Sequence, residues 1–313
     1  MFGSVVIWAW MPILIDTLGR AEFDPYTQNF YRYLATAVFF TGFAALVDRR
    51  GLALAARNWL RYLAPAAAVV GFQTAWVLGI YRTTPTVAAF AEHSGVVFSM
   101  LASAIIFADE RRVVGSWRFL AGAAAVAVGF AGVALGRPSA AGGSTVPGQP
   151  GLGVAFLVLG SLAWAVYGLL IKHVVAPHGA GDPDGRERPG PIPAFAATMA
   201  LALVPFLALA LLAGDVGRVA SARPGDLAIL FGSGIAGVAI GQGLYFVSIR
   251  RVGVATSQVL VLLSPFMTGL CSSVLFGERI AGWQWLGGAV LLAGAAGLVL
   301  SQAGARPDGR TAR

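Results

Sequence analysis

Charged residues are scarce in this sequence, and their scarcity excludes two broad classes of protein. Only 12% of the 313 residues are charged, whereas 57% are hydrophobic, and the mean hydropathy is +0.75. An average soluble domain has about a quarter of its residues charged, and disordered chains are poor in apolar residues. The composition therefore indicates a polytopic membrane protein with no room for a soluble domain.

Cysteine, clustered metal ligands and nucleotide-binding loops are also missing. Cys271 has no second cysteine to pair with, so it forms no intramolecular disulfide and says nothing about the compartment. His173 and His178 have no Cys, Asp or His beside them at metal-ligand spacing, so we predict no metal site. No Gly-x4-Gly-Lys-Ser/Thr motif occurs, so energy for any transport would come from an ion or substrate gradient. We predict no catalytic residue and no cofactor.

The abundant feature is a series of ten apolar segments. A helix needs about 20 mostly apolar residues to cross about 30 Å of hydrocarbon. The first segment has neither a basic leader nor a small-residue cleavage site, so we interpret it as a span and not as a signal peptide. The sequence predicts an all-α integral membrane protein with ten transmembrane helices, at 2–17, 28–47, 62–81, 84–107, 116–136, 151–172, 192–213, 227–249, 254–276 and 283–301.

The net charge of +8 is explained by membrane orientation. The basic residues are spread in ones and twos between apolar segments, which argues against nucleic acid as a partner. If the N-terminus is cytoplasmic, 15 of them lie in inside segments and 6 in outside segments, with Arg32 left within a span. The positive-inside rule then predicts a multi-pass protein of the cell membrane with both termini in the cytoplasm.

An internal repeat organises the chain. Residues 83–110 recur without a gap 168 positions later, at 252–278. Each unit holds five spans, so the second unit must enter the membrane from the opposite side, which makes an inverted repeat. We expect a first unit at 1–137, a linker at 138–150, a second unit at 151–302 and a disordered tail at 303–313. The matched pairs are Arg82 with Arg250, Phe98 with Phe266, and Glu110-Arg111 with Glu278-Arg279.

Two motifs at matching places in the units resemble a known family. FADERRVVGSW ends at Trp117, and FGERIAGWQW ends at Trp285. They resemble the EamA domains of the drug/metabolite transporter superfamily, in which an apolar helix, a Gly-Glu-Arg-like turn, a Trp and a glycine-bearing last helix follow one another. The resemblance implies ten helices, cytoplasmic termini and transport of small metabolites or drugs, often outward. We interpret Glu110 and Glu278 as structural charges at helix ends.

The last helix of each unit carries matching glycines. Gly122 and Gly129 correspond to Gly287 and Gly294. Glycines at such spacing allow close helix packing, so we expect a structural role for them.

Ionisable and polar residues within the predicted spans are candidates for the substrate or proton site, because such residues are costly in a membrane. A rise of about 1.5 Å per residue places Glu92 about 12 Å, Gln73 about 10 Å and Arg32 about 6 Å below the outer surface. Arg32 could instead snorkel to the headgroups, and Glu92 could be a protonated structural carboxyl. Glu92 and His93 are replaced in the second unit by Leu260 and Val261, so the polar centre belongs to the first unit.

Several further candidates for the site have an alternative role in helix packing. Glu92, Gly95, Ser99 and Ser103 share one helix face, which either lines a cavity or packs against a neighbouring helix. His93 points about 100° away from Glu92, so it either relays a proton or faces another helix. Trp76 either stacks on a substrate or serves packing. In the second unit the polar counterparts are Gln242, Tyr245 and Gln258.

Taken together, these patterns predict a secondary active transporter that exports a small metabolite or drug-like molecule by alternating access. Its partners would be that substrate, the lipid bilayer and, if coupling is by protons, protons; the sequence assigns no oligomeric state. We also predict that Arg32 and Glu92 lie on facing helices and pair. The alternatives are a lipid flippase or non-catalytic membrane scaffold and, less favoured, a membrane enzyme acting on lipid-linked substrates. An enzyme would need clustered His, Asp or Glu at a membrane face, and only Asp109-Glu110 comes close.

Overall fold

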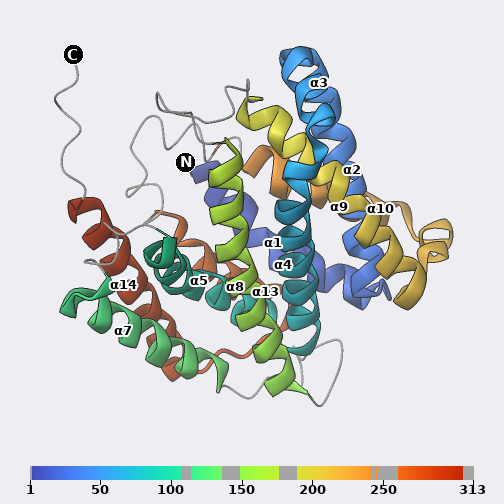
Figure 1. Ribbon diagram of the computed structural model, residues 1–313. Coiled ribbons are helices and arrows are strands. Elements are labelled where there is room, and N and C mark those ends of the chain that lie inside the picture. Colours follow the sequence, from blue (N-terminus) through green and yellow to red (C-terminus); the bar gives the residue numbers. More distant parts are fainter. Residues whose placement is uncertain are drawn as a thin grey trace.

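The computed structural model describes residues 2–106, 114–135, 149–175, 189–241, 244 and 260–305. Every regular element in these ranges is helical, as the sequence predicts (Figure 1). The first five long helices are α1 (Phe2–Arg20), α2 (Pro25–Val47), α4 (Leu63–Arg82), α5 (Pro85–Ile106) and α7 (Trp117–Ala134). The later ones are α8 (Pro150–Val175), α9 (Pro191–Ala213), α10 (Pro224–Gly234), α13 (Ser264–Phe276) and α14 (Gly282–Ala305).

Six of the described helical segments are long and apolar enough to cross a membrane, and α13 is a shorter apolar helix. Several helices begin where a proline follows a polar or glycine residue, because proline suits the first helical position. At α2, Asp24 also accepts hydrogen bonds from the backbone N–H groups of Tyr26 and Thr27, at 2.9 and 2.8 Å. The six segments are Pro25–Val47, Trp59–Arg82, Trp117–Ala134, Pro150–Ile171, Pro191–Ala213 and Gly282–Leu300.

The connection after α2 is itself helical, which the sequence analysis did not predict. It forms α3 (Arg49–Arg57) and the 3-10 turn η1 (Trp59–Tyr62). Helix α3 is amphipathic, with exposed arginines at both ends and Ala55 buried against α9. A short basic amphipathic helix of this kind is typical of the membrane–water interface.

Two helices of the second unit, in the predicted spans 227–249 and 254–276, are irregular, and the described part of the second is not one continuous helix. The helix that starts as α10 continues into a π-helical turn, η3 (Ile235–Ile240). The ninth predicted span breaks at Leu262–Leu263, just before Ser264-Pro265. Pro265 has no N–H, so it cannot serve the carbonyl of Val261 one turn earlier, and the helix is interrupted there.

Helix contacts between the halves follow a reciprocal pattern. Helix α2 packs on α9, α5 on α13, and α7 on α14, each of which pairs a helix with its counterpart in the other unit. The contact of α4 with α9 has its counterpart in the contact of α10 with α2. Two units related by a two-fold axis give this reciprocity.

The seam between α7 and α14 shows the same reciprocity at the residue level. A Cβ added to Gly129 would lie 2.5 Å from the carbonyl oxygen of Gly287, and one added to Gly294 would lie 2.8 Å from that of Gly122. Gly122 and Gly287 occupy corresponding places in the two units, as do Gly129 and Gly294. The two contacts are therefore equivalent when the units are exchanged. The predicted packing role of these glycines is confirmed.

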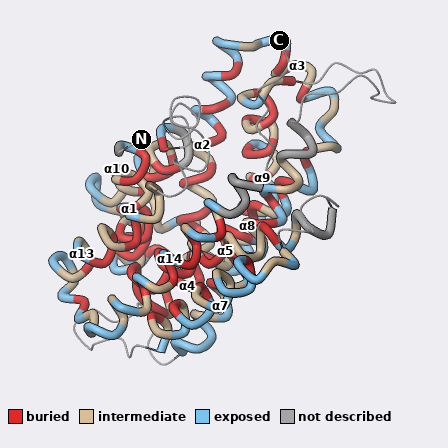
Figure 2. Tube along the Cα trace, turned by 90° about the vertical axis from the view of Figure 1, so that its left-hand side faces the viewer, coloured by how far each residue is buried: buried red, intermediate tan, exposed pale blue. Residues whose placement is uncertain are grey.

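Buried residues gather on the faces that the central helices turn toward one another, and exposed residues lie on the outer faces (Figure 2). The main hydrophobic cluster draws on α1, α2, α4, α5, α7, α8, α9 and α14. In Figure 1, α1 begins, α14 ends and α3 lies in the upper half of the view.

Candidate functional site

The inner face of α2 is polar and buried. Gln28, Arg32 and Thr36 follow one another at helical spacing, and Asn29 and Tyr33 lie beside them. Each of these five side chains is at most 3% exposed. Buried polar groups in a membrane protein are costly and mark binding sites or pathways.

Helix α4 supplies the groups that face this polar side of α2. Tyr33 donates a hydrogen bond to Oε1 of Gln73 at 3.3 Å, and Asn29 donates to the backbone carbonyl of Gln73 at 3.4 Å. Gln28 donates to the hydroxyl of Tyr81 at 2.5 Å, and that hydroxyl donates to the carbonyl of Phe23. The predicted candidates Arg32 and Gln73 therefore border one polar network.

Arg32 lies further from the start of its helix than predicted, and its predicted pairing with Glu92 is not formed. The helix begins at Pro25, so Arg32 is about 10 Å along it. Its guanidinium is buried, not snorkelling, and Nε donates to the hydroxyl of Ser233 on α10 at 3.1 Å. Within the described residues, Arg32 forms no ion pair and its Nη1 has no hydrogen-bond partner.

Glu92 lies near the middle of α5 and is half-buried. Within the described part of the chain its carboxyl makes no hydrogen bond or ion pair. Its neighbour Gly95 faces α8, where a Cβ would lie 3.4 Å from the carbonyl of Ser161. This contact supports packing for Gly95, whereas Ser99 is half-buried and the side chain of Ser103 lies outside the described residues.

His93 faces the other half of the protein. Its Nδ1 lies 2.9 Å from the carbonyl oxygen of Ala89, so this nitrogen carries a proton. The ring also lies against the backbone of Val261, the residue whose carbonyl loses its helical partner to Pro265. Val261 is the counterpart of His93 in the repeat, so α5 meets the broken helix at matching positions.

Trp76 belongs to a row of aromatic side chains between α4 and α8. It stacks on Phe72 with ring centroids 6.0 Å apart, and Phe72 lies 4.8 Å from Trp164, which in turn lies 5.4 Å from Tyr167. The indole N–H of Trp76 is buried and has no partner among the described residues. We call Phe72, Trp76, Trp164 and Tyr167 the aromatic row.

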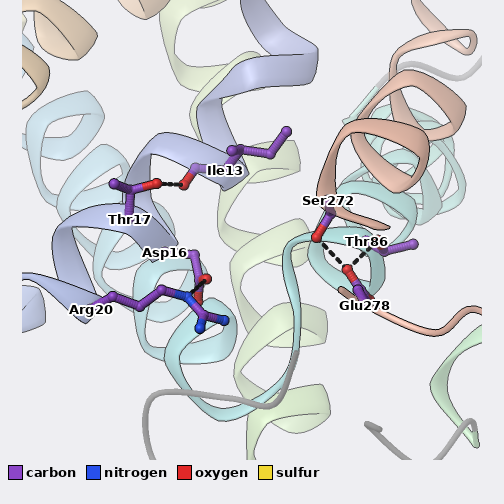
Figure 3. Close-up of polar contacts among 7 residues, drawn as sticks. All are labelled: Ile13, Asp16, Thr17, Arg20, Thr86, Ser272 and Glu278. Atoms are coloured by element: carbon purple, nitrogen blue, oxygen red, sulfur yellow. Dashed lines mark hydrogen bonds and ion pairs between the residues drawn. The ribbon is translucent and has the colours of Figure 1, made fainter. Parts of the chain in front are cut away.

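Glu278, from the family-like turn, ties the two units together at one end of the helices. Its Oε2 accepts hydrogen bonds from Thr86 at 2.7 Å and from Ser272 at 2.5 Å (Figure 3). Glu278 as a whole is only 7% exposed. The expected structural role is supported by these contacts, which involve α5 and α13.

An ion pair within α1 lies in the same region. Arg20 donates through Nε to Asp16 at 2.6 Å (Figure 3). The guanidinium lies 4.4 Å from the ring centre of Phe276. Asp16 is therefore engaged by its own helix, although one of its oxygens has no partner within the described residues.

The remaining candidates, Gln242, Tyr245 and Gln258, lie outside the described residues. Five polar residues near the polar network were not predicted from the sequence: Gln28, Asn29, Tyr33, Thr36 and Ser233. Together with Arg32, the first four form a polar stripe in which each residue has another three or four positions away, which could have indicated a buried polar face on this helix. Ser233 belongs to no comparable series of polar residues in the sequence.

Comparisons with known proteins agree with this architecture. A solved crystal structure of a protein with 16% sequence identity superposes with a TM-score of 0.60, covering 96% of this chain and 94% of that chain. At that identity the likeness shows the fold alone. The comparison with curated proteins found no match. The family model of the EamA-like transporter family matches residues 1–135 and 151–300, so the chain belongs to that family of membrane transporters.

Proposed function

We propose that the protein is a secondary active transporter that exports a small metabolite or drug-like molecule by alternating access. The observation that carries this proposal is the reciprocal packing of the two units, in which α2, α5 and α7 each contact their own counterparts. Units of this kind can rock against each other while a site between them stays in place. The outward direction rests on the family resemblance.

The membrane topology is part of the proposal. Ten spans in two inverted five-helix units, at 1–137 and 151–302, would leave both termini on the cytoplasmic side. The positions of the start of α1 and the end of α14 in the same half of Figure 1 support an even number of crossings. The basic helix α3 would then lie at the cytoplasmic interface, where its arginines meet anionic headgroups.

The site lies where irregular helices of the second unit meet the first. Trp8 donates to the carbonyl of Gly237 in the π-helical turn at 2.9 Å, and His93 meets the broken helix at Val261. Discontinuous helices are typical of transporter sites, because freed backbone groups can contact substrates or ions. We assign the substrate or proton site to Glu92, His93, Arg32, Gln73, Trp76 and Ser99, with Gln242, Tyr245 and Gln258 from the second unit.

Within this site Glu92 would couple transport to protons. A carboxylate that faces water in one state and a dry interior in another must be neutralised before the interior closes, by a proton or by a cationic group. No described group does so in this state, because the carboxyl has no ion-pair partner there. His93, one residue on, is the second protonatable group at the same depth.

The test is counterflow in proteoliposomes. Purified protein is reconstituted, the vesicles are loaded with candidate small metabolites, and uptake of the labelled compound is followed against protein-free vesicles. Counterflow of any such compound supports a transporter. Scrambling of labelled phospholipid without counterflow would favour a flippase, and neither activity would favour a scaffold.

A further inference from the structure

A buried arginine beside the polar network has no counter-ion among the described residues. Arg32 is 3% exposed, Nε is bound to the neutral hydroxyl of Ser233, and Nη1 has no partner among the described residues. Ser233 donates its own proton to the carbonyl of Leu230 at 3.1 Å, so its oxygen is free to accept from Arg32. This hydrogen bond gives one N–H of the guanidinium an acceptor, but a neutral hydroxyl does not neutralise the positive charge.

The acidic residues that precede Arg32 are already engaged, and Glu22 among them lies 3.4 Å from Arg218. Asp24 caps α2 through one carboxyl oxygen and accepts from the backbone N–H of Asp215 through the other, at 2.9 Å. Asp16 pairs with Arg20 at 2.6 Å. The positive charge of Arg32 is therefore not matched within the described residues.

An unpaired buried charge destabilises a protein strongly, because the charge has lost its hydration and gained no partner. Arginine is always protonated, so Arg32 does not escape the cost by losing its proton. A negative group supplied from outside would remove it. The planar fork of a guanidinium suits a carboxylate, which can accept two parallel hydrogen bonds.

The surroundings of Arg32 indicate what else such a ligand would carry. Tyr33, the next residue, packs on Phe206 with ring centroids 4.6 Å apart and hydrogen-bonds to Gln73. Gln73 and Trp76 lie three residues apart on α4, which links the polar network to the aromatic row. An organic molecule bound at Arg32 would thus meet aromatic surface on its apolar part.

We propose that Arg32 binds the carboxylate of the transported molecule, so that the substrates are organic acids or zwitterions with an apolar or aromatic body. That the bound molecule is also transported rests on the proposed function, but the binding site itself does not require transport. The amide oxygens of Gln28 and Asn29, which are buried and unpartnered within the described residues, lie on the same helix face and are free to accept from the ligand.

The test uses three probes that share one ring but differ in charge. Phenylacetate is an anion, phenylacetamide is neutral and phenethylamine is a cation. Each is titrated into the purified full chain in neutral detergent, and both the thermal unfolding midpoint and tryptophan fluorescence are followed. We expect phenylacetate to raise the midpoint and the other two to have a smaller effect or none.

Variants then locate the effect. Arg32→Gln should weaken phenylacetate binding by at least about tenfold, because it removes charge-assisted hydrogen bonds. Arg32→Lys keeps the charge and should retain the preference for phenylacetate at reduced affinity, which covers the case that Arg32→Gln does not fold. Arg223→Gln, at an exposed arginine before α10, is the matched control and should bind like the wild type.

Equal stabilisation by all three probes, no response of the wild type to millimolar phenylacetate, or undiminished binding in Arg32→Gln would each overturn the proposal. Phosphatidylglycerol is added in a separate arm. A response to this lipid alone, lost in Arg32→Gln, would also overturn it, because the anion would then be a headgroup. Binding that depends on Arg32 without any flux in vesicles would support the anion site and reject the transporter function. Flux that is unaffected by Arg32→Gln would support the transporter function and reject the anion site.

Discussion

At the residue scale, the carboxyl of Glu278 shows how a family motif acts in this chain. It accepts from Thr86 of the first unit and Ser272 of the second, so one side chain holds α5 and α13 together (Figure 3). Hydrogen bonds to a charged group contribute about 1.5–3 kcal/mol each. The motif is therefore a joint between the units as well as a turn.

We expect Glu278→Ala to lower the thermal unfolding midpoint by at least about 3 °C, because it leaves two buried hydroxyls without their acceptor. Differential scanning fluorimetry of the purified protein in detergent measures this. Glu22→Ala is the control, since the Glu22 side chain is 84% exposed and its contact with Arg218 is 3.4 Å long. Equal shifts in the two variants would show that Glu278 is not a special joint.

The sequence predicted which polar residues lie within apolar helices but not which residues they contact. Composition and depth identified Arg32, Gln73, Glu92 and His93 as polar groups in apolar helices, and the structure places Arg32 and Gln73 beside one network. Their partners were not predictable, because Ser233 is about 200 residues from Arg32 and depends on how α10 packs on α2. The Arg32–Glu92 pair failed for the same reason: depth alone does not determine which helix a side chain faces.

At the scale of elements, the seam between α7 and α14 is formed by glycines. Backbone atoms approach so closely at Gly129 that a Cβ would lie 2.3 Å from the backbone nitrogen of Leu291. Backbone moves less readily than a side chain, so the helices would have to separate. Gly297, also on α14, has nothing within 4 Å of the position of a Cβ.

These two glycines give a matched test. Gly129→Ala should lower the unfolding midpoint by at least about 2 °C, because overpacking costs about 1–3 kcal/mol. Gly297→Ala should leave the midpoint unchanged or raise it, since alanine favours a helix over glycine. Both are measured by the same thermal scan, and a Gly129→Ala protein as stable as Gly297→Ala would contradict the close packing.

Hydrophobic runs predicted the positions of the described helices to within a few residues, because a membrane helix needs a fixed length of apolar chain. The irregular parts were missed. Helix α3 is too short and too basic to be identified as a membrane span, although the arginines that flank its apolar residues are visible in the sequence. Pro265 signals the break at Leu262–Leu263, but the π-helical turn at Ile235–Ile240 has no comparable signal.

At the scale of the whole molecule, the topology follows from the odd number of spans proposed in each unit. We expect a cysteine in the linker at 138–150 to be reachable from outside the cell and a cysteine between the predicted spans 151–172 and 192–213 to be protected. The background is Cys271→Ser, which removes the only natural cysteine. In that background, a membrane-impermeant maleimide applied to intact cells should label Ser144→Cys and not Gly185→Cys. Labelling of the second alone would reverse the predicted orientation and place both termini outside the cell.

The central claim is that Glu92 couples transport to protons, and the most direct measurement is flux against pH. A substrate found by counterflow is followed in proteoliposomes across a range of external pH, for the wild type, Glu92→Gln and the exposed control Glu22→Gln at equal protein content. We predict that an imposed pH gradient drives flux in the wild type and the control, and that Glu92→Gln loses this driven flux but keeps counterflow. An unchanged rate and an unchanged pH profile in Glu92→Gln would contradict the claim and leave Glu92 a structural carboxyl.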